Sequence, residues 1–224
     1  MPRNTRIDVG GEIYHIINRA NARLQIFHND KDYKLFETVL REAKGRININ
    51  IYSYSIMPNH WHLVVSPKKD GDLAKFMAWL TMTHTQRWHV MYRTIGGGHL
   101  YQGRYKSFLV EKSNYFIQVC RYVERNPVRA KIVKKAENWQ WGSLWRRENG
   151  NPEQQKLLNS WPEPMAKDYL NWVNTMEPEE NLKSIRNSVN KGKPYGKDSW
   201  IGKVIDVYKL ESTIRNPGRP KKGS

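Results

Sequence analysis

The chain has 224 residues, enough for one sizeable domain with an extension or for two small domains. Its 38 Lys and Arg against 21 Asp and Glu give a formal net charge of +17. That excess indicates a polyanionic partner, with nucleic acid as the first candidate and a membrane surface as the alternative. The single cysteine, Cys120, excludes an internal disulfide and a cysteine-rich zinc module. No apolar run reaches the roughly 18 residues of a membrane span and no signal peptide is apparent, which predicts a soluble intracellular protein.

The predicted elements alternate in the order strand, helix, strand, strand, helix, strand, helix. Asn29-Asp30, Asp70-Gly71-Asp72 and Ser113 provide N-terminal caps for the three helices, and Gly45 is expected to end the first. Pro58-Asn59 is expected to join the second and third strands in a hairpin. Strands are expected at about 12–18, 47–57, 60–65 and 107–111, and helices at about 31–44, 73–92 and 114–125.

This order is the split βαβ arrangement, which predicts an α+β, ferredoxin-like or RRM-like fold. We expect a four-stranded antiparallel sheet with helices on one face and the other face open for a ligand. After about Glu148 the composition shifts toward Asn, Pro, Lys and Glu. We therefore predict a domain over residues 1–147 and a basic extension over 148–224, mainly helical or irregular, with short helices near 169–176 and 200–208.

Two histidines flank Trp61 at the start of the third predicted strand. Side chains two apart in a strand share a face, so His60 and His62 project together while Trp61 enters a core. Two neutral imidazoles on one face can bind one divalent metal ion. A pair of ordinary surface or core histidines is the alternative, and the clean alternation together with a tyrosine further along the chain favours the metal site.

The third predicted helix carries Tyr115, Gln118 and Tyr122 at positions i, i+3 and i+7, along one edge. Tyr115 lies in the first turn, where its hydroxyl can extend beyond the apolar stripe. A phenol with a pKa near 10 is a poor nucleophile at neutral pH, and a nearby divalent cation helps by polarising a target phosphate. The amide oxygen of Gln118 is a candidate third metal ligand. A helical tyrosine alone is usually structural, so Tyr115 gains its interest from His60 and His62.

Several segments, in the right order, resemble known transposases. His60-Trp61-His62 resembles the His-hydrophobic-His signature of HUH single-strand endonucleases, and Tyr115 lies where single-tyrosine transposases of the IS200/IS605 type carry their nucleophile. Longer segments are similar to the REP-associated tyrosine transposases, a group within those single-tyrosine enzymes. These segments are residues 57–62, 102–107, 122–130 and 139–143, and the tail over 210–220 resembles the end of longer members.

The resemblance implies a domesticated transposase that binds REP hairpins with an adjacent guide sequence and cuts single-stranded DNA. The expected products are a 5′-phosphotyrosine link and a free 3′-hydroxyl. It implies that Tyr115 is the nucleophile and that His60 and His62 bind Mg²⁺ or Mn²⁺, with Gln118 as the third ligand chosen on geometry. A monomer is expected, with a dimer as the alternative because insertion-sequence relatives act as dimers. The implied location is cytoplasmic and nucleoid-associated.

Basic residues in the matched segments are candidates for DNA contacts. Arg104 and Lys106, just before the fourth strand, are expected to bind phosphates. In the tail, Arg219 and Lys221 belong to a Pro-Gly-Arg-Pro-Lys segment similar to minor-groove hooks, with a disordered basic tail as the alternative. Further candidates on the predicted helices and beyond are Arg87, Arg93, Arg121, Arg125 and Arg129.

Two other functions compete with the tyrosine nuclease. A catalytically inactive hairpin-binding protein would use the same fold, as RNA-recognition domains do, although the strands carry no convincing stacking signature. A metal-dependent phosphodiesterase using water would leave Tyr115 structural. A covalent protein–DNA adduct would distinguish all three.

Overall fold

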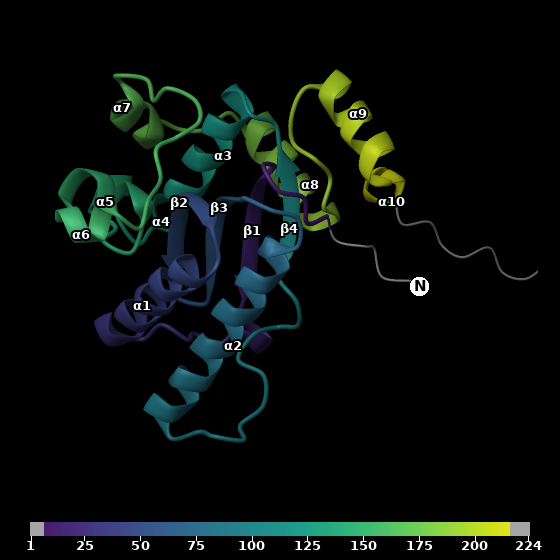
Figure 1. Ribbon diagram of the computed structural model, residues 1–224. Helices are drawn as coiled ribbons and strands as arrows, with labels where there is room; N and C mark the ends of the chain where they lie inside the picture. Colours follow the sequence, from purple (N-terminus) through teal and green to yellow (C-terminus); the bar gives the residue numbers. More distant parts are fainter. Residues whose placement is uncertain (1–6, 216–224) are drawn as a thin grey trace, which may run out of the picture.

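The structure is a computed structural model and describes residues 7–215. Its centre is a four-stranded antiparallel sheet in the order β2-β3-β1-β4, with helices around it (Figure 1). This confirms the predicted α+β class and the split βαβ order. The strands are β1 (Ile13–Arg19), β2 (Ile49–Met57), β3 (His60–Pro67) and β4 (Lys106–Val110).

The β2–β3 hairpin sets the register of the sheet. Met57 pairs with His60, so the two-residue connection is Pro58-Asn59, as predicted. On the other side of β3, His60 lies opposite Arg19 and His62 opposite Ile17. Paired residues in an antiparallel sheet share a face, so this register fixes which side chains of β1 accompany the two histidines.

Helices α1 (Asp30–Arg46) and α2 (Asp72–Tyr92) pack on one face, as expected. The capping box at Asn29 starts α1, but Gly45 does not end it: the helix continues to Arg46, since the backbone N–H of Ile47 still bonds to a carbonyl of the helix. The first turn of α2 is capped from a distance by Asp8, whose carboxylate accepts from the backbone of Leu73 and Ala74.

The expectation of an open second face is wrong. Helices α3 (Asn114–Glu124), α4 (Asn126–Arg129) and α8 (Glu179–Lys191) lie on that side of the sheet (Figure 1). Phe116 and Ile185 from these helices share one core with strand residues such as Val64 and Phe108. The physical reason is that α3 has a wide apolar stripe of its own, which is stable only when buried against the sheet.

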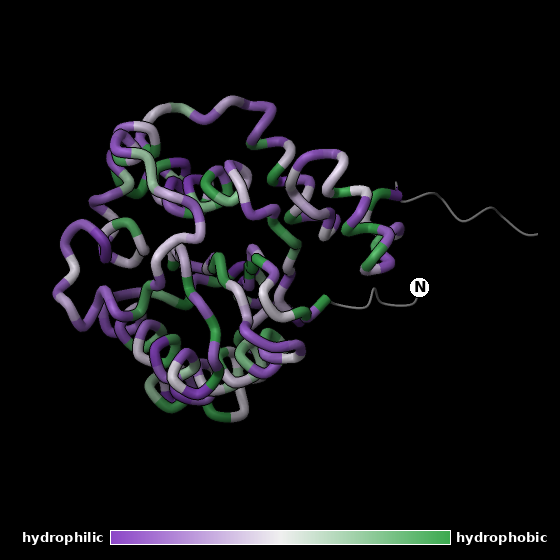
Figure 2. Tube along the Cα trace, turned by 45° about the horizontal axis from the view of Figure 1, so that its top comes forward, coloured by the Kyte–Doolittle hydropathy of each residue, from purple (hydrophilic) through white to green (hydrophobic). Residues whose placement is uncertain are grey.

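The C-terminal region is helical and packs against both the sheet and α3. Helix α5 spans the boundary predicted at residues 147 and 148. Helix α8 was not predicted, although Glu179 and Glu180 follow Pro178 at its start and Gly192 ends it in the left-handed conformation. The apolar residues of α8 form only a short stripe among many polar residues. The outer loops of the protein are mostly hydrophilic (Figure 2). The remaining elements are η1 (Asn21–Arg23), η2 (Ala136–Asn138), α5 (Ser143–Asn149), α6 (Pro152–Gln155), α7 (Tyr169–Asn174), α9 (Asp198–Tyr208) and α10 (Glu211–Ile214).

Within residues 7–215, none of the helices combines the length and the apolar character needed to cross a membrane.

Candidate active site at the histidine pair

His60 and His62 stand side by side at the start of β3. Their ring centroids are 5.1 Å apart, on the face covered by α3. Trp61 points to the opposite face, where it is fully buried and its indole N–H donates to the hydroxyl of Tyr101 at 3.0 Å. The side-chain alternation expected from the sequence is therefore present, and it follows from the period of two residues in a strand.

Each histidine has its Nδ1 atom engaged by a neighbouring side chain. Nδ1 of His60 lies 2.6 Å from Oδ1 of Asn59, and Nδ1 of His62 lies 2.9 Å from Nε2 of His15. Burial, aided by the charge of Arg19, lowers the pKa of His60 to about 4. Burial also holds the pKa of His62 well below its usual value. Both rings are therefore neutral at physiological pH, which is the form that binds a metal ion.

His15 is a third histidine at this site that the sequence analysis did not select. It is completely buried on β1, and its ring packs against Phe108 with centroids 4.8 Å apart. Burial, with a smaller contribution from the charge of Arg129, lowers its pKa to about 3. The signal in the sequence is a histidine with apolar neighbours on both sides in the first strand, but only pairing of β1 with β3 brings it to His62.

Tyr122, near the C-terminal end of α3, is the tyrosine that lies against the histidines. Its ring centroid is 6.0 Å from that of His62 and 6.1 Å from that of His15, both edge-on. The guanidinium of Arg129 lies 4.1 Å above the Tyr122 ring and donates to the Tyr122 carbonyl at 2.5 Å. Tyr122 thus lies between the histidine pair and a cation, an environment suited to chemistry on an anion.

Tyr115 and Gln118 lie in a different place. The Tyr115 ring contacts Tyr195 edge-on at 5.2 Å, and Oε1 of Gln118 accepts from the Tyr195 hydroxyl at 2.6 Å. Both line a polar cavity of about 340 Å³ beside α8. Tyr122 lies seven positions after Tyr115, which corresponds to roughly 10 Å along a helix axis. The three residues share an edge of α3 as predicted, but it is the Tyr122 end of that edge that contacts His62.

The two histidines suit a divalent ion, but they do not form a complete protein site. In the described part of the chain, no group of three or more His, Cys, Asp or Glu is arranged to hold a metal ion. An amide is available at Asn126, one turn after Tyr122: its Oδ1 accepts from Arg129 at 2.5 Å. Its buried Nδ2 lacks a hydrogen-bond partner among residues 7–215. Oxygen and imidazole donors fit Mg²⁺ or Mn²⁺.

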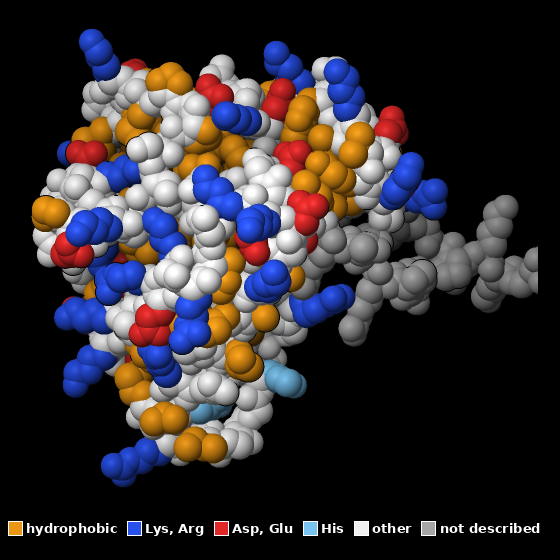
Figure 3. Space-filling model, in the orientation of Figure 1, with side chains coloured by type: hydrophobic (Ala, Val, Ile, Leu, Met, Phe, Trp, Pro, Cys, Tyr) orange, Lys and Arg blue, Asp and Glu red, His pale blue; other side chains and the backbone are white. Residues whose placement is uncertain are grey.

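A basic groove of about 320 Å³ lies at the same end of the sheet. Arg19, Arg104 and Lys106 line it, together with polar side chains such as Gln102. Arg19 pairs with His60 across the strands, so the groove adjoins the histidine pair. The predicted DNA contacts Arg104 and Lys106 are thus near the site. Other Lys and Arg side chains are spread widely over the face of the molecule drawn in Figure 3.

The other basic candidates fall into two groups. Arg87 and Arg93 belong to α2 and its C-terminal end, where Arg93 is exposed. Arg87 makes a two-pronged salt bridge to Glu42, with both side chains partly exposed. Three further arginines, from α3 and α4, are bound to the segment that follows α7 rather than being available to solvent. They are Arg121, Arg125 and Arg129. The predicted tail contacts Arg219 and Lys221 lie outside the described residues.

Comparison with known proteins identifies the class and then the family. The chain belongs to the transposases, a class of DNA-processing enzymes. Within that class, the family described as "Transposase IS200 like" matches residues 9–126, more than half of the chain, and this protein is a member of it.

Two solved structures are similar to this one. One is the REP-associated tyrosine transposase bound to a REP hairpin, with a TM-score of 0.57 and 17% identity, covering 75% of this chain and 100% of that one. The other is a transposase-like protein of Deinococcus radiodurans R1, with a TM-score of 0.39 and 18% identity, covering 59% and 91%. The first likeness confirms the fold, and with the family it confirms the predicted resemblance. No curated protein matches this chain.

Proposed function

We propose that this protein is a metal-dependent endonuclease and strand transferase that binds REP-type DNA hairpins and cuts single-stranded DNA beside them. A tyrosine oxygen attacks the phosphorus of a phosphodiester. The 5′-phosphate becomes linked to the tyrosine, and the 3′-oxygen leaves and becomes a free 3′-hydroxyl. The observation that carries the proposal is the contact between Tyr122 and His62, beside His60, on one face of the sheet.

Geometry favours Tyr122 as the nucleophile over Tyr115, the residue predicted from the sequence. A nucleophile has to be within reach of the groups that bind the target phosphate. The Tyr122 ring contacts the His62 ring and the Arg129 guanidinium, whereas the Tyr115 ring packs edge-on against Tyr195. The two tyrosines share one helix edge, so a comparison of their variants is well matched.

His60 and His62 are the proposed metal ligands, each through Nε2. Asn59 and His15 engage the Nδ1 atoms, and hydrogen bonds of this kind orient a ligating imidazole. Asn126 replaces Gln118 as our candidate for the third ligand, because Asn126 lies one turn after Tyr122 and shares Arg129 with it, whereas Gln118 lies in the cavity with Tyr195. A bound Mg²⁺ or Mn²⁺ would polarise the phosphate and offset the charge that develops on it.

A DNA hairpin with a single-stranded flank is the proposed partner. The structurally similar transposase is described as bound to a REP hairpin. Here the groove lined by Arg19, Arg104 and Lys106 adjoins His60 and can hold the phosphates of an extended strand. Such a partner implies a cytoplasmic, nucleoid-associated protein, and we propose that it acts as a monomer.

The decisive experiment compares Tyr122→Phe with Tyr115→Phe. Each change removes one oxygen, and Tyr115→Phe controls for the loss of a phenol on the same helix. End-labelled hairpin with a single-stranded flank is incubated with Mn²⁺, and cleavage and covalent adduct are read on denaturing gels. We expect Tyr122→Phe to lose both products while retaining hairpin affinity, and Tyr115→Phe to retain both.

Other outcomes lead to different conclusions. Loss of the adduct in Tyr115→Phe alone would support the nucleophile predicted from the sequence. Cleavage without adduct in both variants would indicate attack by water. Tight hairpin binding by the wild type without any cleavage would favour the inactive binding protein.

A further inference from the structure

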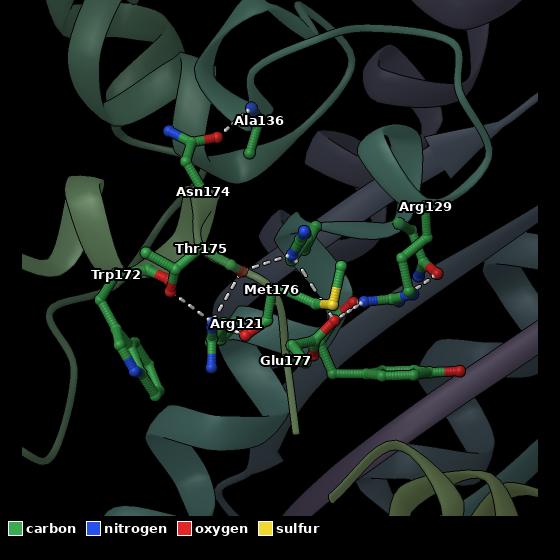
Figure 4. Close-up of polar contacts among 11 residues, drawn as sticks. Arg121, Arg129, Ala136, Trp172, Asn174, Thr175, Met176 and Glu177 are labelled. Atoms are coloured by element: carbon green, nitrogen blue, oxygen red, sulfur yellow. Dashed lines mark hydrogen bonds and ion pairs between the residues drawn. The ribbon is translucent and has the colours of Figure 1, made fainter. Parts of the chain in front are cut away.

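The C-terminal extension contacts α3 and α4 through the segment 172–177, which leads from the end of α7 toward α8. Arg121 donates to the carbonyl and the hydroxyl of Thr175 at 2.8 and 2.9 Å, and its guanidinium stacks over Trp172 at 4.1 Å (Figure 4). Arg125 donates to the same carbonyl at 2.9 Å. These bonds hold a short extended stretch of the extension directly over the helix that carries Tyr122.

Glu177 is the residue of this segment that reaches the site. It is 7% exposed, and its carboxylate accepts from Nη1 of Arg129 at 2.6 Å. The other nitrogen of the same guanidinium donates to the Tyr122 carbonyl and to Oδ1 of Asn126, both at 2.5 Å. Arg129 is thus fixed on one side by Glu177 (Figure 4) and on the other by α3 and α4, and its guanidinium lies over the Tyr122 ring.

We propose that Glu177 is a positioning residue for cleavage, acting through Arg129 to hold the Tyr122 ring against His62. The inference rests on the proposed function, and it makes the C-terminal extension part of the cleavage site. An arginine side chain has many rotamers, and a guanidinium bonded on both edges loses most of them before the substrate arrives. A ring packed beneath a fixed guanidinium is in turn restrained, which is the condition that effective attack requires.

A different role for the same contact makes the opposite prediction. If Glu177 only occupied the place of a DNA phosphate, removing its charge would release Arg125 and Arg129 and strengthen DNA binding. If Glu177 positions Tyr122, removing its charge slows cleavage and leaves hairpin affinity nearly unchanged. The two readouts therefore separate the two roles.

The test uses Glu177→Gln in the full chain, with Glu37→Gln as the matched control. Glu37 is also a buried carboxylate paired with an arginine, Arg146, but it lies on the α1 side of the sheet. Each variant is assayed for hairpin affinity and for single-turnover cleavage at saturating hairpin with Mn²⁺. In ¹³C-tyrosine-labelled protein, the Tyr122 ring resonances, assigned by their loss in Tyr122→Phe, report on the ring without any DNA.

We expect Glu177→Gln to lower the single-turnover rate about 10- to 100-fold, with less than a twofold change in hairpin affinity. It should also move the Tyr122 resonances, and Glu37→Gln should do neither. If Glu177→Gln does not fold, Glu177→Asp keeps the charge and should give a smaller change in the same direction.

Unchanged resonances and rate in a folded Glu177 variant would overturn the proposal, as would tighter DNA binding at an unchanged rate. Failure of the proposed function is distinguishable, because a wild type that does not cleave still yields the resonance comparison.

Discussion

The two faces of the sheet have different contents although they are built from the same four strands. On the α1–α2 face, strand residues such as Trp61 and Leu63 pack with Phe36 and Phe76 in a large apolar core. On the α3–α8 face, the sheet presents His15, His60 and His62 beside an apolar cluster with fewer members.

The difference between the two faces shows that a core residue and a site residue can be adjacent in the sequence. Trp61 and His62 are neighbours in β3, and the strand period alone sends one into each face. A shift of one residue in pairing would bury the histidines with α1 and α2 and place the tryptophan on the α3–α8 face. The α1–α2 face therefore stabilises the register on which the chemistry of the other face depends.

The largest effect should come from breaking the α1–α2 face. Trp61→Ala removes a fully buried indole and its hydrogen bond to Tyr101. We expect a loss of about 3–5 kcal/mol in the free energy of unfolding, measured by urea denaturation. Tyr122→Phe, on the other face, keeps its packing and should cost less than about 1 kcal/mol. Similar losses of unfolding free energy in the two variants would contradict the view that the α1–α2 face supplies stability and the other face supplies the chemistry.

An intermediate effect is expected from a substitution of His15. This residue orients the proposed metal ligand His62 but is not itself a proposed ligand. His15→Gln should weaken Mn²⁺ binding about 10- to 100-fold, because His62 loses the partner that holds its ring. The measurement is a Mn²⁺ titration followed by electron paramagnetic resonance. His84→Gln is the control, since it makes the same change at a buried histidine of the α1–α2 face. Equal loss in both variants would count against a specific role for His15.

The last prediction concerns acid. Burial lowers the pKa of His84 to about 3, while an unfolded histidine titrates near 6.5. As pH falls below 6.5, the unfolded chain takes up a proton that folded His84 does not accept until about pH 3. Stability is therefore lost as pH falls across this window, by about 1.4 kcal/mol per pH unit for this one group. In urea unfolding from pH 6.0 down to 4.5, His84→Gln should show a slope shallower by about one proton, and an unchanged slope would contradict this.

Much of the fold could be predicted because its signals are local. Alternation in β3, the Pro58-Asn59 turn and the caps at Asn29 and Ser113 each act over a few residues, and each is present in the structure. The covered second face was missed because the side of the sheet on which α3 packs, and the addition of α8 beside it, depend on contacts between residues far apart in the chain. Local patterns carry no information on such long-range packing.

The sequence by itself determined the order of strands and helices along the chain, the common face of His60 and His62, and the helix edge shared by Tyr115, Gln118 and Tyr122. Tertiary structure decided which end of that edge contacts the histidines, because the crossing of α3 over the sheet is set by packing between residues distant in sequence. It also brought His15 to His62 and Glu177 to Arg129. Helix periodicity fixes the direction of a side chain around the axis, but only the packing of the helix against its neighbours fixes its position along them.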